Sequence, residues 1–166
     1  MAKPIKPSRA QYLRDDVIRG GVDLLLFAHK AYLRHADCEL ATLGLGRAHH
    51  RCLYFVSRQP DLSVSDLLRL LGVTKQSLGR VLNLLVKQGL IEQRVGEKDR
   101  RNRLLRLTPA GEALEQQLFE GMHQNMSRAY SDSGEEAVNG YWAVMQNLMS
   151  EDVREQFEAF HLPCSR

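Results

Sequence analysis

The feature that most constrains the fold is the stretch from Leu62 to Thr108, which begins with two short helices joined by a glycine turn. The segment Ser63–Asp66 has the Ser-x-x-Asp spacing of a capped helix N-terminus before an apolar run, and Gly72 is the residue type that ends helices in a left-handed conformation. Thr74 predicts the N-cap of a second helix, and Gly89 predicts its end. The two helices together predict a helix-turn-helix.

A charged β-hairpin is predicted directly after the second helix. Residues 90–95 form an outgoing strand, residues 96–101 a charged tip with the sequence Gly-Glu-Lys-Asp-Arg-Arg, and residues 103–107 an arginine-containing return strand. A hairpin in this position is the wing of a winged helix-turn-helix. Such units exist mostly to hold DNA, so the stretch favours a DNA-binding function.

The second predicted helix has one apolar and one polar face. Apolar side chains recur at i, i+3, i+4 and i+7 and predict a face that packs on a core: Leu78, Val81, Leu82 and Leu85. The opposite face carries side chains that can form bidentate bonds with base edges in the major groove, and Gly79 leaves no side chain where the helix would approach DNA. An ordinary solvated helix face has the same pattern, and it is the neighbouring wing that favours base reading.

Charge is distributed unevenly along a chain whose formal net charge is only +3. Residues 67–106 hold ten basic and three acidic residues, whereas residues 107–166 hold three basic and ten acidic ones. The middle segment is therefore +7 and the C-terminal segment −7. A basic patch beside an acidic region is typical of proteins that bind a polyanion. Solvated charge runs alone would not concentrate the basic residues on the predicted helix and wing.

Several motifs of this region occur together in one known family. They are the run Leu62–Leu67, the run Val73–Leu85, the triplet Gly89–Ile91 and, most specifically, the Asp-Arg-Arg and Leu-x-Leu-Thr-x-x-Gly signature in residues 99–111. With these motifs, the stretch from about Leu45 to Leu118 resembles the MarR family of bacterial transcription regulators. The resemblance implies a mainly α fold with a small β-wing, in which N- and C-terminal dimerisation helices flank a winged helix-turn-helix. It also implies a regulator that is not an enzyme.

The remaining sequence predicts one compact domain made mostly of helices. We divide the chain into a flexible basic N-terminal arm at residues 1–10, a helical dimerisation region at residues 11–44 and 109–160, and the winged helix-turn-helix DNA-binding region at residues 45–108. Helices are expected over about 11–43, 46–58 and 109–130, and again from about 133.

The N-terminal helix carries more apolar surface than a small domain can cover, including Leu24, Leu25, Phe27 and Tyr32. The family resemblance implies that such helices form a two-fold dimer. Two recognition helices about one DNA turn apart then read an inverted repeat. The expected assembly is a homodimer.

The expected DNA contacts follow from the polar face of the second helix and from the wing. Base reading in the major groove is expected from Gln76, Ser77, Arg80 and Asn83. Phosphate contacts are expected from Ser65, Lys75 and Lys87. The wing is expected to touch the minor groove and backbone through Arg100 and Arg101, assisted by Lys98 and Arg103. Asp99 is expected to orient the wing arginines, because a carboxylate near phosphate is repelled.

A small aromatic or phenolic effector is implied by the resemblance, bound between the dimerisation helices and the winged helix. The residues that would line this cleft are His29, Tyr32, His49, His50, Arg51, Phe55 and Arg58. Ordinary cores contain the same residue types, and two other sensing mechanisms stay open. One is a zinc site of His35, Cys38, His49 and Cys52, because two His-x-x-Cys pairs each share a helix face. The other is thiol redox sensing by Cys38 or Cys52. Of the three mechanisms we favour the organic effector, and we expect no bound metal.

The sequence lacks the signatures of other function classes. It has no Gly-rich phosphate loop, no His-Glu-x-x-His and no Gly-x-Ser-x-Gly motif, so neither an enzyme nor a cofactor is expected. It has no apolar run near the ~20 residues of a membrane span and no secretory signal, and its three widely spaced cysteines fit free thiols. We therefore expect a cytoplasmic protein whose partners are double-stranded DNA and a second copy of itself. A winged helix that binds protein or RNA stays an alternative, as does an activator in place of the favoured repressor.

Overall fold

The computed structural model describes residues 12–96 and 103–161. Within these residues the chain is mainly helical, with one small sheet, which confirms the fold class expected from the sequence. In chain order the elements are α1 (Asp15–Thr42), α2 (Arg47–Arg58), β1 (Leu62–Ser63), α3 (Val64–Leu71), α4 (Lys75–Lys87), β2 (Ile91–Val95), β3 (Arg103–Leu107), α5 (Pro109–Ser133), α6 (Glu135–Asn147) and α7 (Glu151–His161).

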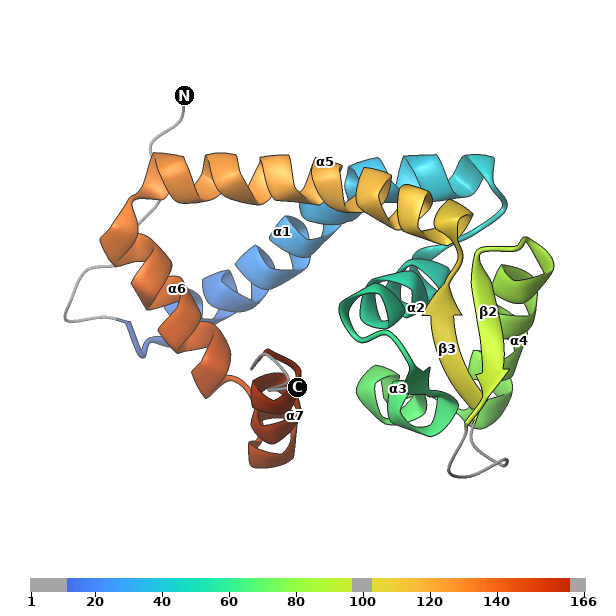
Figure 1. Ribbon diagram of the computed structural model, residues 1–166. Helices are drawn as coiled ribbons and strands as arrows, with labels where there is room; N and C mark the ends of the chain where they lie inside the picture. Colours follow the sequence, from blue (N-terminus) through green and yellow to red (C-terminus); the bar gives the residue numbers. More distant parts are fainter. Residues whose placement is uncertain (1–11, 97–102, 162–166) are drawn as a thin grey trace.

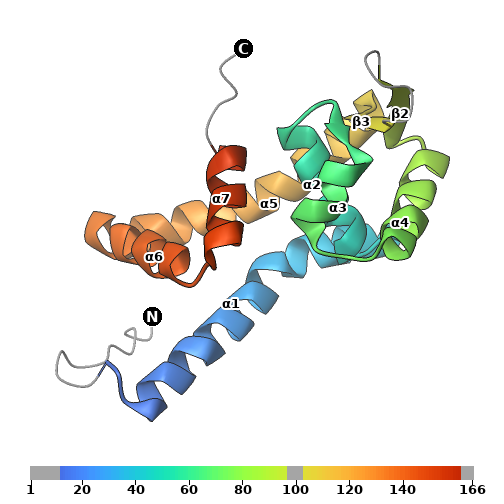
Figure 2. The ribbon, with the colours of Figure 1, turned by 90° about the horizontal axis from the view of Figure 1, so that it is seen from below.

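The long helix α5 connects two groups of shorter elements. Figure 1 shows α5 running the length of the molecule, with the C-terminal half of α1 beside it, α2 to α4 and the sheet at one end, and α6 and α7 at the other. Figure 2 shows the N-terminal half of α1 projecting away from the remaining elements. Since β3 leads directly into α5 through Thr108, the wing is joined to the long helix by a single residue.

The caps predicted for the two short helices are present. The Ser63 hydroxyl accepts the Asp66 backbone N–H at 3.0 Å, and α3 ends at Gly72 with a φ of 62°. The Thr74 hydroxyl accepts the Ser77 backbone N–H at 3.2 Å, and Gly89 follows α4 with a φ of 68°. These local bonds satisfy backbone groups that a helix end leaves unpaired. They explain why the ends of α3 and α4 lie where the sequence predicts them.

The sheet contains one strand that the sequence did not predict. Its order is β1-β3-β2, and both pairings are antiparallel. The hairpin register pairs Ile91 with Leu107, as expected for a wing, whereas β1 adds the pair Leu62 and Leu105. A two-residue strand carries no alternation of its own, so only its partner strand identifies it.

The core lies inside the winged helix-turn-helix and extends to the long helices. Leu53, Leu67, Leu85 and Leu105 are fully buried there, and Leu40 of α1 and Leu118 of α5 join them from the long helices. The winged helix-turn-helix and the junction of α1 with α5 therefore share one apolar interior.

The helices outside this unit differ in detail from the sequence prediction. The helix α1 begins at Asp15 and continues without interruption through Gly20 and Gly21 to Thr42. The last predicted helix is two helices, because α6 ends at Asn147 and α7 starts at Glu151. Among the described residues, no helix has the length and apolar character needed to cross a membrane.

Candidate nucleic-acid interface

The helix α4 separates its apolar and polar faces as its sequence predicts. Leu78, Leu82 and Leu85 are buried, and Val81 is half-buried. All the proposed contact residues on this helix are exposed: Lys75, Gln76, Ser77, Arg80, Asn83 and Lys87. Two amides and a guanidinium thus share one solvent face of a helix whose other face is fixed in the core, which is the arrangement that base reading requires.

The N-terminus of α4 combines a hydroxyl cap with a lysine. The Thr74 hydroxyl donates to the Ser77 Oγ at 2.9 Å and accepts the Ser77 backbone N–H. The Ser77 oxygen therefore acts as an acceptor within the helix cap, and its own proton can point outward. Lys75 lies in the first turn, and no acidic residue is present there. A helix N-terminus with a lysine and a hydroxyl favours a phosphate group.

The helix α3 and the strands β2 and β3 carry further exposed polar residues. Ser65 is exposed on the first turn of α3, and Arg103 is exposed at the start of β3. Arg69 and Arg94 are further exposed basic residues that our sequence reasoning did not single out, although the charge of the middle segment includes them. Both are engaged with acidic neighbours, since Arg69 pairs with Asp66 at 2.7 Å and Arg94 with Glu92 at 2.6 Å.

The base of the wing is tied to the turn before α3. Asp61 has a φ of 66°, a conformation that aspartate tolerates better than most residues, and its backbone N–H donates to the Leu105 carbonyl at 3.0 Å. Its carboxylate pairs with Arg106 on β3, and this hydrogen bond raises the pKa of the Arg106 guanidinium. The wing tip itself, with Lys98, Asp99, Arg100 and Arg101, lies outside the described residues.

Three of the proposed effector residues lie where α1, α2, α6 and α7 approach one another. Tyr32 of α1 is half-buried, and its pKa is raised by burial and then by the neighbouring hydroxyls of Tyr54 and Tyr141. Phe55 and Arg58 of α2 lie at the end of that helix, and both contact α7.

The other four effector candidates have different surroundings. His49 caps its own helix, because the Gly46 N–H donates to its Nδ1 at 3.1 Å. Arg51 donates to the Leu71 carbonyl at 3.3 Å, at the end of α3. His50 is buried, and burial lowers the pKa of its imidazole while nearby Asp37 partly opposes the shift. His29 lies exposed on α1, close enough to Asp37 for its charge to lower the pKa of that carboxyl slightly, after the larger effect of Arg47.

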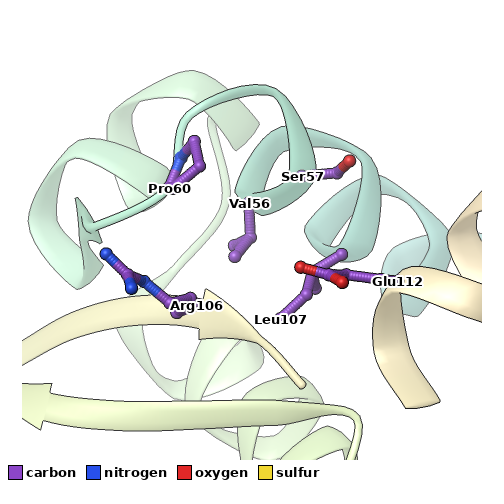
Figure 3. A pocket seen from close by; sticks show the side chains of 6 residues that line it. All are labelled: Val56, Ser57, Pro60, Arg106, Leu107 and Glu112. Atoms are coloured by element: carbon purple, nitrogen blue, oxygen red, sulfur yellow. The ribbon is translucent and has the colours of Figure 1, made fainter. Parts of the chain in front are cut away.

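A cleft of about 340 Å³ opens elsewhere, between α2, β3 and α5 (Figure 3). It is lined by Val56, Ser57, Pro60, Arg106, Leu107 and Glu112. None of the seven effector candidates, all of which lie in the described part of the chain, lines this cleft. Its walls come from segments about 50 residues apart, so no sequence pattern could have indicated it.

The alternative sensing residues are not brought together in the chain. Across residues 12–96 and 103–161, no three His, Cys, Asp or Glu side chains form a group that could hold a metal ion. The ring of His35 packs over Gly121 of α5, and Cys38 is exposed. Cys52 is buried, and burial raises the pKa of its thiol to about 12, so the nucleophilic thiolate is disfavoured at neutral pH.

Comparison with known proteins agrees with this geometry. A family model described as the MarR family matches residues 43–102. Over 147 residues the chain is 40% identical to the HTH-type transcriptional regulator PetP of Rhodobacter capsulatus, and the match covers 89% of each protein. The chain belongs to the MarR family. It is a DNA-binding transcription regulator of the MarR type and is not an enzyme.

Solved structures of MarR proteins have the same fold. A crystal structure of MarR is 25% identical with a TM-score of 0.65, and covers 87% of this chain and 97% of its own. A MarR family regulator from Silicibacter pomeroyi is 23% identical with a TM-score of 0.64, covering 86% and 94%. A MarR variant from E. coli, solved in complex with operator DNA, is 21% identical with a TM-score of 0.63, covering 83% and 99%.

Proposed function

We propose that this MarR protein binds an inverted-repeat operator in double-stranded DNA as a homodimer and represses transcription there. The observation that carries the proposal is the exposed face of α4, where Gln76, Arg80 and Asn83 stand opposite a fully packed apolar face. A related fold is known in complex with operator DNA. Because the partner is chromosomal DNA, the protein acts in the cytoplasm.

Each contact residue has a role that follows from its chemistry. Gln76, Ser77, Arg80 and Asn83 read base edges in the major groove. Ser65, Lys75 and Lys87 bind phosphates on either side of that groove. Arg100, Arg101, Lys98 and Arg103 carry the wing contact with the minor groove and backbone, and Asp99 orients the arginines.

The dimer is supported by apolar side chains that the described chain leaves exposed. Leu24 is 71% exposed and Phe27 is 72% exposed on the projecting half of α1, and Val144 of α6 is 61% exposed. The four successive residues 24–27 are all apolar and all exposed, and in a helix they point in four directions about 100° apart. One flat partner surface cannot cover all of them, so we propose that α1 is enclosed by several helices of a second copy.

In this assembly we propose a separate role for each region of the chain. Residues 11–44 and 109–160 form the dimerisation region, residues 45–108 bind DNA, and residues 1–10 are a basic arm. A small aromatic or phenolic effector releases the DNA by changing the spacing of the two recognition helices, since both must reach successive major grooves. By linkage, DNA must then weaken effector binding by the same factor.

Selection of binding sites from random duplex DNA tests this function. The selected sequence is expected to be an inverted repeat, and log K for it is expected to fall linearly with log salt concentration. Sedimentation should show a dimer both free and on the selected DNA. Equal affinity for duplex DNA of any sequence would contradict operator reading, and preferential binding of RNA would favour the alternative role of the winged helix.

A further inference from the structure

One face of the wing hairpin carries a row of charges that alternate in sign. Figure 1 shows β2 and β3 side by side, and their register places Glu92 of β2 directly opposite Arg106 of β3. Because side chains alternate between the two faces of a strand, Arg94 lies on the same face as Glu92. Asp61 pairs with Arg106 from the turn before β1. The row therefore runs from Asp61 through Arg106 and Glu92, and it ends at Arg94 near the wing tip.

Glu92 lies between two arginines and forms its ion pair with one of them. The Arg106 guanidinium is paired with the Asp61 carboxylate, whereas the Glu92 carboxylate pairs with the Arg94 Nη2 at 2.6 Å. The charge of Glu92 still raises the pKa of the Arg106 guanidinium, after the larger effect of Asp61. The pairing of Asp61 with Arg106 thus directs Glu92 to Arg94.

The ion pair of Glu92 with Arg94 can open at little cost. The Arg94 side chain is 54% exposed and the Glu92 side chain is 40% exposed, so water and salt screen their attraction. A phosphate group offers a guanidinium the same bidentate geometry as a carboxylate. Arg94 can therefore exchange the Glu92 carboxylate for a phosphate of DNA.

Arg94 and the proposed wing contact Arg103 lie on opposite faces of the hairpin. Arg103 is paired with Val95 in the register, and the side chains of the successive residues Arg94 and Val95 point to opposite faces. The minor groove is only about 6 Å wide and has one phosphate chain on each side. A hairpin that enters this groove turns one face to each chain, so the two arginines face different strands of the duplex.

We infer that Glu92 is a built-in competitor of DNA, which holds Arg94 in the free protein and is displaced by a backbone phosphate when the wing binds. Arg94 is then a further phosphate contact, and Glu92 is a positioning residue that lowers the affinity for DNA. The inference rests on the proposed wing contact. Because phosphates carry no sequence information, Glu92 lowers the affinity for operator and for random duplexes alike.

Fluorescence anisotropy of a fluorescein-labelled random-sequence duplex, titrated at several NaCl concentrations, tests the competition. Glu92→Gln keeps the shape of the side chain without its charge and should tighten binding about 1.5- to 5-fold, the factor that corresponds to an exposed ion pair. The slope of log K against log NaCl concentration should become steeper by up to about 0.9, because only the wild type takes up a cation at the freed Glu92 carboxylate. Arg94→Ala should weaken binding.

A double-mutant cycle distinguishes this competition from simple repulsion between Glu92 and DNA. If Glu92 acts through Arg94, the gain from Glu92→Gln should largely disappear in the Arg94→Ala background. Arg94→Lys keeps the positive charge and should keep the gain. As a matched control, Glu136→Gln removes the same charge from the first turn of α6, at the other end of α5 from the wing, and should leave the affinity unchanged (Figure 1).

The inference is overturned if Glu92→Gln binds the duplex no more tightly than the wild type, or if it gains the same factor with and without Arg94. An unchanged salt slope in Glu92→Gln would also overturn it. Failure of the wing contact itself gives a different result, because Arg100→Ala with Arg101→Ala would then leave DNA binding unchanged. If that double variant binds DNA less tightly while the cycle shows no coupling, the inference fails and the proposed function stands.

Discussion

Replacing Gly111 with alanine should destabilise the protein, because the added methyl group would clash with the backbone carbonyl of Leu90. Gly111 lies in the first turn of α5, and its N–H donates to the Thr108 hydroxyl at 3.1 Å. A Cβ at this position would stand 2.0 Å from the Leu90 carbonyl oxygen and 3.0 Å from its carbon. The Thr108 hydroxyl also donates to the Gly89 carbonyl at 2.5 Å, so the start of α5 is held against the turn after α4.

Two opposing effects set the change in unfolding free energy that Gly111→Ala causes. Inserting a methyl group into a packed site costs about 1–3 kcal/mol, and the upper end applies here because a backbone carbonyl cannot rotate away as a side chain can. Alanine gains about 1 kcal/mol over glycine through its helix propensity. The net loss of unfolding free energy for Gly111→Ala is therefore about 2 kcal/mol, which for a chain of this length lowers Tm by roughly 4–8 °C.

Three other helical glycines supply matched controls. A Cβ at Gly79 or Gly140 would meet nothing within 4 Å, so alanine there should raise the unfolding free energy by up to about 1 kcal/mol. A Cβ at Gly121 would stand 2.2 Å from the His35 ring, a side chain that can turn aside, so its effect should lie between the two extremes.

Urea unfolding followed by circular dichroism measures these differences. All variants must be compared at one protomer concentration, because the proposed dimer makes apparent stability depend on it. A Gly111→Ala protein as stable as the Gly79→Ala protein would refute the reasoning, since helix propensity would then outweigh the close approach of α5 to Leu90.

The other predictions concern DNA, thiol chemistry and assembly. Arg80→Ala should cost about 1–3 kcal/mol at the selected operator and much less on random DNA, and equal losses in fluorescence anisotropy would make Arg80 a phosphate contact. Arg100→Ala combined with Arg101→Ala should lower the affinities for operator and for random DNA by similar factors. The slope of log K against log salt concentration should shrink by about 0.9 for each phosphate that the variant no longer neutralises, and an unchanged slope would contradict the wing assignment. Cys52, whose thiol is buried with a pKa of about 12, should resist iodoacetamide at pH 8 in the native protein and react only after unfolding, as peptide mapping would reveal. Removal of residues 1–40 should leave a monomer or an aggregate in sedimentation, whereas a stable monomer of the full-length chain at micromolar concentration would refute the dimer.

The local structure of the helix-turn-helix, α3 and α4, could be predicted directly from the sequence. Ser63, Gly72 and Thr74 fix the ends of α3 and α4 through bonds between residues at most four positions apart. The 3.6-residue period separates the buried Leu82 from the exposed Arg80 without any knowledge of the partner elements. The candidate DNA-reading face on α4 was therefore predictable in residue detail.

The candidate effector region was predictable only in part. Tyr32, Phe55 and Arg58 were named from a family resemblance, and they do lie where helices from both ends of the chain approach. His49 and Arg51 were named on the same ground, and one nitrogen of each bonds to the backbone, His49 Nδ1 to the Gly46 N–H and Arg51 Nη2 to the Leu71 carbonyl. Residue type alone does not reveal whether a polar group has found a partner inside the fold.

By itself the sequence determined the ends of α3 and α4, the polar and apolar faces of α4 and the family, because capping, periodicity and the wing signature act over a few residues. The tertiary structure alone decided the pairing of β1 with β3, the cleft between α2, β3 and α5, and the contact of Phe160 with Phe55. The rings of Phe55 and Phe160 are 105 positions apart in the chain but 5.2 Å apart in space. Such contacts depend on how several helices pack at once, and no local pattern in a single sequence records that packing.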